Sequence, residues 1–133
     1  MDFKKAINSE ISNTEKKPKH INWEPTGEYK FTLTIPPTVY PPREDTDILA
    51  KYLLEIGIVD KKRMIEIGCG SGAISILATK LGWDVTACDI NPFAVAATIG
   101  NAKSNGITKI EVIEGGISPT TSKISANKWY GSG

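Results

Sequence analysis

One stretch, MIEIGCGSGAISILATKLG at positions 64–82, constrains the fold more than any other part of the chain. It begins as a short apolar run, crosses Gly68, Gly70 and Gly72 within five positions, and continues with the periodicity of a helix. A strand that turns into a helix through glycines presents backbone N–H groups and the positive end of a helix dipole to a ligand. The stretch therefore predicts a strand, a ligand-binding loop and a helix.

The same alternation continues along the chain. Three apolar segments are predicted as strands, at 63–67, 84–89 and 109–114, and the residues between them have helical patterns. Strands that alternate with helices of this length favour right-handed crossovers and a parallel sheet. We therefore predict an α/β, Rossmann-like fold with a partial parallel sheet in strand order 3-2-1 and helices on both faces. A ligand is expected at the carboxyl ends of the first two strands.

Two further helices are predicted from caps and periodicity. One has Asp45 or Thr46 as its cap, ends at Gly57 and places apolar residues on one face: Ile48, Leu49, Tyr52, Leu53 and Ile56. The other is capped by Asn91, has Pro92 in its first turn and ends near Gly106. Both caps indicate helices with defined ends.

The ends of the chain differ in composition from its middle. Residues 1–24 are polar and rich in lysine, which predicts a flexible arm. The alternation of Tyr29, Phe31 and Leu33, followed by paired prolines, predicts a short edge strand and an extended loop. Residues 119–133 are predicted to be a tail that cannot supply the remaining strands of a complete domain.

Composition excludes several classes of protein. The 133 residues are enough for one domain, and a formal net charge of +1 provides no field that would drive the chain onto nucleic acid or anionic lipid. Two cysteines and one histidine are too few for a disulfide framework or a metal cluster, so no metal is predicted. No apolar run approaches the roughly 20 residues of a membrane span. A cytoplasmic protein is expected.

The glycine loop alone is compatible with two ligands. The letters GCGSGA satisfy a dinucleotide pattern as well as the GxGxG of S-adenosylmethionine sites. Asp89, which ends the second predicted strand, suits hydrogen bonds to ribose hydroxyls in either case. The loop and Asp89 together leave the choice of ligand open.

Glu66 separates the two ligands. It lies two positions before the first glycine, where a dinucleotide would place its pyrophosphate, and like charges there repel. S-adenosylmethionine has no phosphate and carries an ammonium and a sulfonium group, which a carboxylate attracts. Glu66 therefore favours S-adenosyl-L-methionine as the cofactor.

Three segments carry a family resemblance. VYPPREDTDIL, IEIGCGSGAISI and ACDINPFAVAAT resemble the class I S-adenosylmethionine-dependent methyltransferases, in particular the branch that methylates the glutamine N5 of release factors. The resemblance covers about residues 36–118, and residues 25–118 are interpreted as the cofactor-binding half of such a domain. It implies that Thr46 lies over the cofactor, that Glu66 and Gly68 hold its methionine part and that Asp89 holds the ribose. The full predicted set is Thr46, Glu66, Gly68, Cys69, Gly70, Asp89, Ile90, Gly116 and Ile117.

Two departures from the family pattern matter. Gly116 stands where the family usually has an aspartate that binds the adenine amino group, so one cofactor contact is missing. The chain also contains no AsnProProTyr motif, which positions the attacking nitrogen in the family. Positioning of this kind is worth several kcal/mol. No catalytic residue is therefore predicted, and this chain by itself is expected to be inactive.

Other functions stay open at this point. A nicotinamide-binding oxidoreductase domain and a noncatalytic scaffold are the alternatives, and an rRNA or small-molecule acceptor is open within the methyltransferases. The resemblance implies a release factor as substrate and a small zinc-binding activator subunit as partner. The first predicted strand, 63–67, has an unpaired edge in a half sheet, which predicts self-association through that edge.

Overall fold

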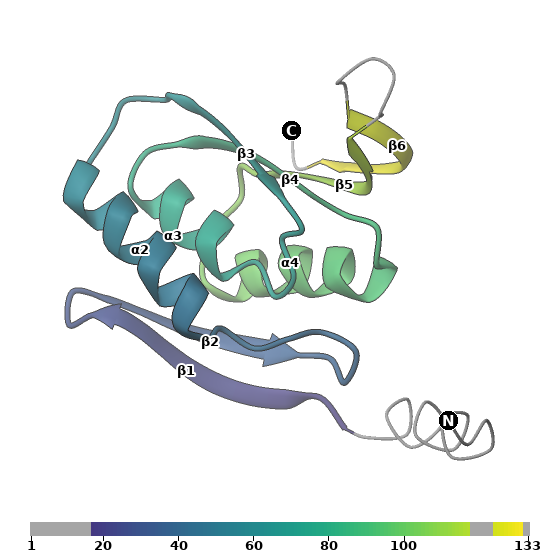
Figure 1. Cartoon of the computed structure of the whole chain (residues 1–133), viewed down its shortest axis with the longest axis horizontal. Helices are drawn as coiled ribbons and strands as arrows, with labels where there is room; N and C mark the ends of the chain where they lie inside the picture. Colours follow the sequence, from purple (N-terminus) through teal and green to yellow (C-terminus); the bar gives the residue numbers. More distant parts are fainter. Residues whose placement is uncertain (1–16, 118–123, 132–133) are drawn as a thin grey trace.

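The computed structural model describes residues 17–117 and 124–131. These residues form three layers, which are a four-stranded sheet, a layer of helices and a two-stranded hairpin on the far side of the helices (Figure 1). The core lies between the layers and includes the fully buried side chains of Leu33, Ile76, Leu77 and Val85. The α/β class is confirmed.

The sheet contains β3 (Arg63–Ile67), β4 (Asp84–Asp89), β5 (Glu111–Ile117) and β6 (Ile124–Gly131). Their order is β3-β4-β5-β6. The first three strands pair in parallel, with Glu66 beside Ala87 and Cys88 beside Ile113, whereas β6 pairs antiparallel with β5. The segment predicted as a tail thus contributes a strand, because the outer edge of β5 offers unpaired backbone groups that a further segment satisfies.

The helices α3 (Ala73–Lys80) and α4 (Pro92–Ser104) lie on the same face of the sheet (Figure 1). The expectation of helices on both faces is therefore wrong for the described residues. The reason is topological, because strands that step in one direction through right-handed crossovers return every helix to the same side. The opposite face carries Ile65 and Ile67, which are 58% and 54% exposed.

The hairpin consists of β1 (Lys19–Thr26) and β2 (Tyr29–Ile35), which pair antiparallel. The predicted arm over residues 1–24 is wrong from Lys19 onward, while residues 1–16 lie outside the described part. A strand needs only every second side chain to be apolar, so a sparse apolar pattern does not distinguish a strand from a flexible segment. Trp23 is buried and stacks on Phe31 with ring centroids 5.9 Å apart, which holds the hairpin together.

Helix α2 (Glu44–Ile56) ends at Gly57 as predicted, and this glycine has a φ angle of +81°, but the cap is Arg43 rather than Asp45 or Thr46. Its buried residues are Ala50 and Leu53, so most of the predicted apolar face is not covered. Four members of that face are more than half exposed: Ile48, Leu49, Tyr52 and Ile56. The helix packs on α3 and the hairpin, and its remaining apolar side borders the free edge of β3.

Helix α4 begins as the sequence predicts. The Asn91 side chain accepts a hydrogen bond from the Phe93 N–H at 3.0 Å, and Pro92 occupies the first turn. In the part of the chain that the structure describes, no helix has the length and apolar character needed to cross a membrane.

Candidate functional site

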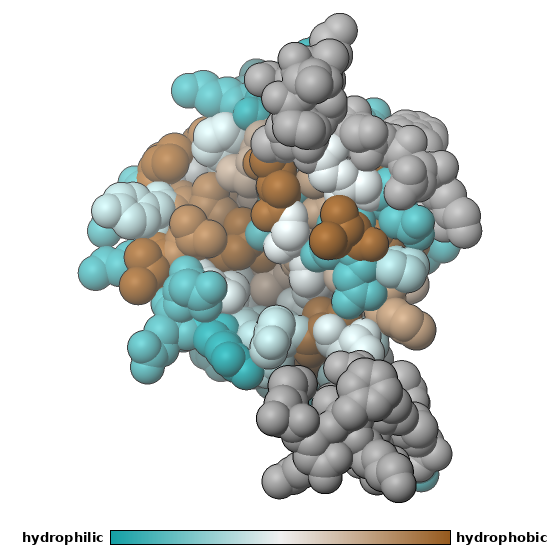
Figure 2. Space-filling model, turned by 45° about the vertical axis from the view of Figure 1, so that its right-hand side comes forward, coloured by the Kyte–Doolittle hydropathy of each residue, from teal (hydrophilic) through white to brown (hydrophobic). Residues whose placement is uncertain are grey.

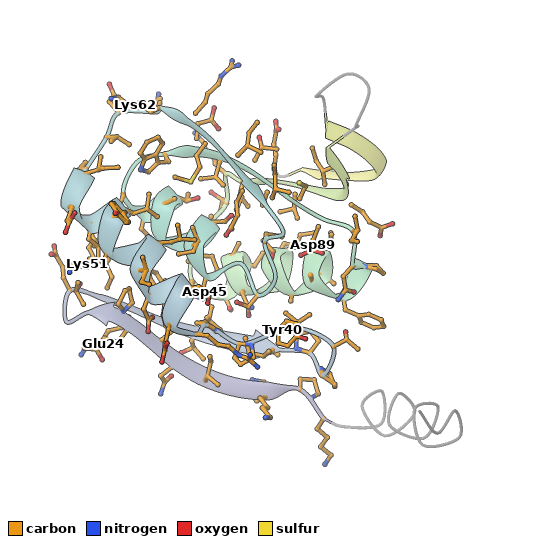
Figure 3. All side chains as sticks on the ribbon, viewed as in Figure 1. Glu24, Tyr40, Asp45, Lys51, Lys62 and Asp89 are labelled. Atoms are coloured by element: carbon orange, nitrogen blue, oxygen red, sulfur yellow. The ribbon has the colours of Figure 1, made fainter. Side chains whose placement is uncertain are left out.

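A cavity of about 940 Å³ lies at the carboxyl ends of β3 and β4. Its walls come from the glycine loop, the first turns of α2 and the loop before α2. Three residues labelled in Figure 3 line this cavity: Tyr40 from the loop before α2, Asp45 from the first turn of α2 and Asp89 from the end of β4. The predicted residues that line it are Thr46, Glu66, Gly68, Cys69, Gly70 and Asp89.

The glycine loop is a tight turn that is held in place by hydrogen bonds to β4. Gly68, Gly70 and Gly72 have φ angles of +76°, +56° and +88°. The Gly68 and Cys69 N–H groups donate to the Cys88 carbonyl oxygen at 2.8 and 3.0 Å. A Cβ atom at Gly72 would meet the Thr98 Cα at 3.0 Å, so this position requires glycine for its conformation and for its close approach to α4.

Glu66 is held in the wall of the cavity. The Ser75 hydroxyl of α3 donates to Glu66 Oε1 at 2.6 Å. Burial raises the pKa of the Glu66 carboxyl to about 7, the hydrogen bonds from Ser75 oppose this shift, and the charge of Asp89 adds to it. The carboxyl group is therefore part protonated at neutral pH, and a cationic ligand would favour its charged form.

Asp89, at the end of β4, holds the glycine loop in place through a hydrogen bond. Its Oδ2 accepts the Gly70 N–H at 3.0 Å and its Oδ1 accepts the Asn91 N–H at 2.9 Å. Each carboxylate oxygen has a further lone pair for a ligand hydroxyl. Asp89 thus fixes the loop and can also bind a ribose.

The first turn of α2 forms the opposite wall. Thr46 Oγ1 accepts the Arg43 N–H at 3.4 Å, and the Arg43 guanidinium lies 4.8 Å from the centre of the Tyr40 ring. Arg43 is the only cationic side chain among the lining residues, against three carboxylates, Asp45, Glu66 and Asp89. The cavity therefore suits a ligand with more positive than negative groups.

Cys69 and the three predicted residues outside the cavity lining need separate description. Cys69 is buried, and burial raises the pKa of its thiol to about 12, so it is a packing residue rather than a nucleophile. Ile90 is exposed and lies outside the cavity walls, and a Cβ at Gly116 would lie 3.6 Å from its Cγ2. Ile117 ends β5, and its side chain lies outside the described part. The structure therefore brings six of the nine predicted residues together in the cavity, and Ile90, Gly116 and Ile117 are not among its lining residues.

Three residues that support the loop were missed from the sequence. They are Ser75, Thr98 and Asn101, all buried. Thr98 donates to the Gly70 carbonyl at 3.1 Å, and Asn101 donates to the Ser71 carbonyl at 2.8 Å. The available signal was a polar residue on the buried face of a predicted helix, since Ala94, Thr98 and Asn101 follow helical spacing. No cluster of three or more metal-ligating side chains occurs in residues 17–117 and 124–131.

The parallel sheet, the glycine loop and the cavity at the carboxyl ends of its first two strands form the ligand site of a Rossmann-like fold. The matches to known proteins place this fold in the class of the S-adenosylmethionine-dependent methyltransferases. Residues 45–127 match the family model of the ribosomal protein L11 methyltransferases, and the chain belongs to this family. The predicted methyltransferase class is confirmed.

Individual relatives agree with this assignment. The chain is 42% identical over 76 residues to the "Putative protein N5-glutamine methyltransferase" of Methanocaldococcus jannaschii, covering 56% of this chain and 37% of the relative. It is 41% identical over 61 residues to the ribosomal protein L11 methyltransferase of Campylobacter fetus, covering 46% and 21%. The chain thus matches between about a fifth and two fifths of these relatives' length.

Solved structures show the same fold. The ribosomal protein L11 methylase of Lactobacillus delbrueckii subsp. bulgaricus has a TM-score of 0.54 and 30% identity, over 65% of this chain and 46% of that one. The 16S rRNA N2 G1207 methyltransferase of T. thermophilus, solved with AdoMet and guanosine, has a TM-score of 0.63, 16% identity and coverage of 71% and 27%. These proteins are all methyltransferases, so the oxidoreductase and scaffold alternatives gain no support.

Proposed function

We propose that this chain binds S-adenosylmethionine and forms the cofactor-binding part of a protein methyltransferase. The observation that carries the proposal is the meeting of Glu66, Asp89 and the glycine loop in one cavity. When bound, S-adenosylmethionine supplies an electrophilic methyl group. The chain's own part is to hold and orient the cofactor.

The proposed roles follow the chemistry of each group. Glu66 faces the positive methionine end, and Asp89 accepts hydrogen bonds from the ribose hydroxyls. The loop at Gly68, Cys69 and Gly70 lets the ligand approach the backbone, and Thr46 covers it from α2. Ile90, Gly116 and Ile117 are the proposed surroundings of the adenine.

The protonation of Glu66 strengthens this choice of ligand. A pyrophosphate beside Glu66 would drive the carboxyl further toward its neutral form and gain nothing from its charge. An ammonium or sulfonium group favours the ionised carboxylate and is attracted by it. Glu66 therefore discriminates through its ionisation as well as through its position.

Calorimetry with S-adenosylhomocysteine and with NAD tests the proposal. Binding of S-adenosylhomocysteine without binding of NAD is expected, and Asp89→Asn should weaken it. Glu55→Gln, which changes a carboxylate outside the cavity, is the matched control and should leave the affinity unchanged. Tighter binding of NAD, or binding of neither compound, would overturn the assignment.

The methyl acceptor is proposed to be a protein, with a glutamine side chain as the reacting group. Support comes from the M. jannaschii relative named for N5-glutamine methylation and from the segment VYPPREDTDIL. A release factor as substrate and a small zinc-binding activator subunit as partner belong to this proposal, as does a cytoplasmic location, with which the two free, buried cysteines agree. Transfer of labelled methyl groups to a release factor, compared with ribosomal protein L11, distinguishes the two acceptors.

We further propose self-association through the free edge of β3. The open face, defined here as Leu49, Tyr52, Ile65 and Ile67, is more than half exposed and lines one side of the cavity. Figure 2 shows hydrophobic side chains gathered over part of the surface rather than scattered. Exposed apolar side chains beside an unpaired strand edge favour association. Light scattering should therefore find a dimer or larger species.

A further inference from the structure

Asn101 of α4 and Asn105, which caps the C-terminal end of that helix, bind the outer edge of β2. Asn105 accepts the Thr32 N–H at 3.2 Å and donates to the Thr32 carbonyl at 2.9 Å. Asn101 accepts the Thr34 N–H at 2.7 Å and donates to the Thr34 carbonyl at 3.0 Å. A carboxamide has one donor side and one acceptor side, as a peptide group has, so each asparagine pairs with one residue of the strand as a neighbouring strand would.

The spacing explains why a helix can do this. Four residues of a helix rise about 6 Å and two residues of a strand rise about 6.6 Å, so positions 101 and 105 match positions 32 and 34. The paired asparagines therefore cover the backbone of an otherwise free edge of the hairpin.

Asn101 differs from Asn105 in one respect. Its amide also donates to the Ser71 carbonyl of the glycine loop at 2.8 Å, and its side chain is 2% exposed. One turn earlier on α4, Thr98 donates to the Gly70 carbonyl. Because a trans peptide group is planar, a Gly70 carbonyl held toward α4 turns the Ser71 N–H away from that helix.

We infer that Asn101 is a positioning residue, which joins the hairpin to the glycine loop and thereby sets the loop for its ligand. The inference rests on the proposed function for the identity of that ligand. The single buried amide of Asn101 links Thr34 of β2 to Ser71 of the glycine loop, although these two residues are more than thirty positions apart in the sequence. Asn105 makes the same two hydrogen bonds to β2, here called the clamp, but has no bond to the loop among the described residues. It is therefore the natural control.

The test compares Asn101→Ala with Asn105→Ala in the full chain. Both variants should lower stability, because both lose the clamp on β2. Only Asn101→Ala should weaken S-adenosylhomocysteine binding, by about tenfold, and speed amide hydrogen exchange at Ser71 and Gly72. Equal changes in affinity and in loop exchange for the two variants would overturn the inference.

A second pair covers the case in which Asn101→Ala does not fold. Thr34→Pro and Thr32→Pro each remove one N–H that donates to an asparagine rather than to the neighbouring strand β1. Thr34→Pro should weaken the binding of S-adenosylhomocysteine, and Thr32→Pro should not. An unchanged affinity in Thr34→Pro would refute the link between the hairpin and the loop. Failure of the wild-type chain to bind S-adenosylhomocysteine would instead count against the proposed function, and loop exchange would still decide the role of Asn101.

Discussion

Helices α3 and α2 are neighbours in the same layer, yet they are covered to very different extents. Six consecutive residues of α3, from Ala73 to Ala78, are buried, whereas α2 buries only Ala50 and Leu53. Helix α3 lies among the sheet, α2 and α4, while the apolar side of α2 borders the free edge of β3. The molecule thus has a closed region, which comprises α3, the glycine loop and the residues that support the loop. It also has an open region, which comprises α2 and the open face.

The difference bears on function as well as on packing. Glu66, Asp89 and the loop all receive hydrogen bonds within the closed region, so their positions are fixed before a ligand arrives. The open region borders the same cavity with exposed aliphatic and aromatic side chains. The structure therefore holds a preorganised cavity wall next to an exposed apolar surface.

The largest expected effect comes from the same substitution in both regions. Leu77→Ala in α3 should lower the free energy of unfolding by about 2–5 kcal/mol, because Leu77 is fully buried and its loss leaves a cavity. Leu49→Ala in α2 should cost less than about 0.5 kcal/mol in the monomer. Urea unfolding measures both, and similar costs would remove the distinction between the two regions.

Glu66 gives the next largest effect, which depends on pH. Its pKa in the folded state, about 7, lies above the ordinary value of 4.5, so its contribution to stability is complete below pH 4.5 and is lost as pH rises through 7. The loss amounts to roughly 3 kcal/mol. Glu66→Gln should flatten the dependence of unfolding free energy on pH between 5 and 8. Unchanged slopes in that variant would show that Glu66 is ionised throughout.

Gly72→Ala tests the contact between the loop and α4. Positive φ and a Cβ that would meet Thr98 predict a loss of about 2 kcal/mol, measured by thermal or urea unfolding. Gly100→Ala is the control, since a Cβ there has open space and alanine favours a helix, so it should be neutral or slightly stabilising. A harmless Gly72→Ala would mean that the loop and the helix are not in close contact.

The smallest effect on the monomer is expected from the open face. The pair Ile65→Lys and Ile67→Lys should change monomer stability by less than about 1 kcal/mol, because both side chains are exposed. The pair should shift the molecular mass from light scattering toward the monomer. A wild-type chain that is already a stable monomer would contradict self-association.

Much of the closed region could be predicted from the sequence, because its signals are local. The glycine loop, the strands at 63–67 and 84–89 and the Asn91 cap appear as predicted. The burial of α2 could not be predicted, because its periodicity indicates an apolar side without indicating what covers it. The strand β1 was missed because only alternate side chains of a strand need be apolar. The bonds of Asn101 to β2 were missed because Thr34 and Asn101 are 67 residues apart in the sequence.

The most direct test is the affinity for S-adenosylmethionine at pH 6 and pH 7.5, in the wild-type chain and in Glu66→Gln. A cationic ligand that favours the ionised form of a carboxyl with a pKa of about 7 should bind about five- to tenfold more tightly at pH 7.5. The variant should bind weakly and equally at both pH values. Affinity that is independent of pH in the wild type, or that falls as pH rises, would contradict selection of the cofactor by Glu66.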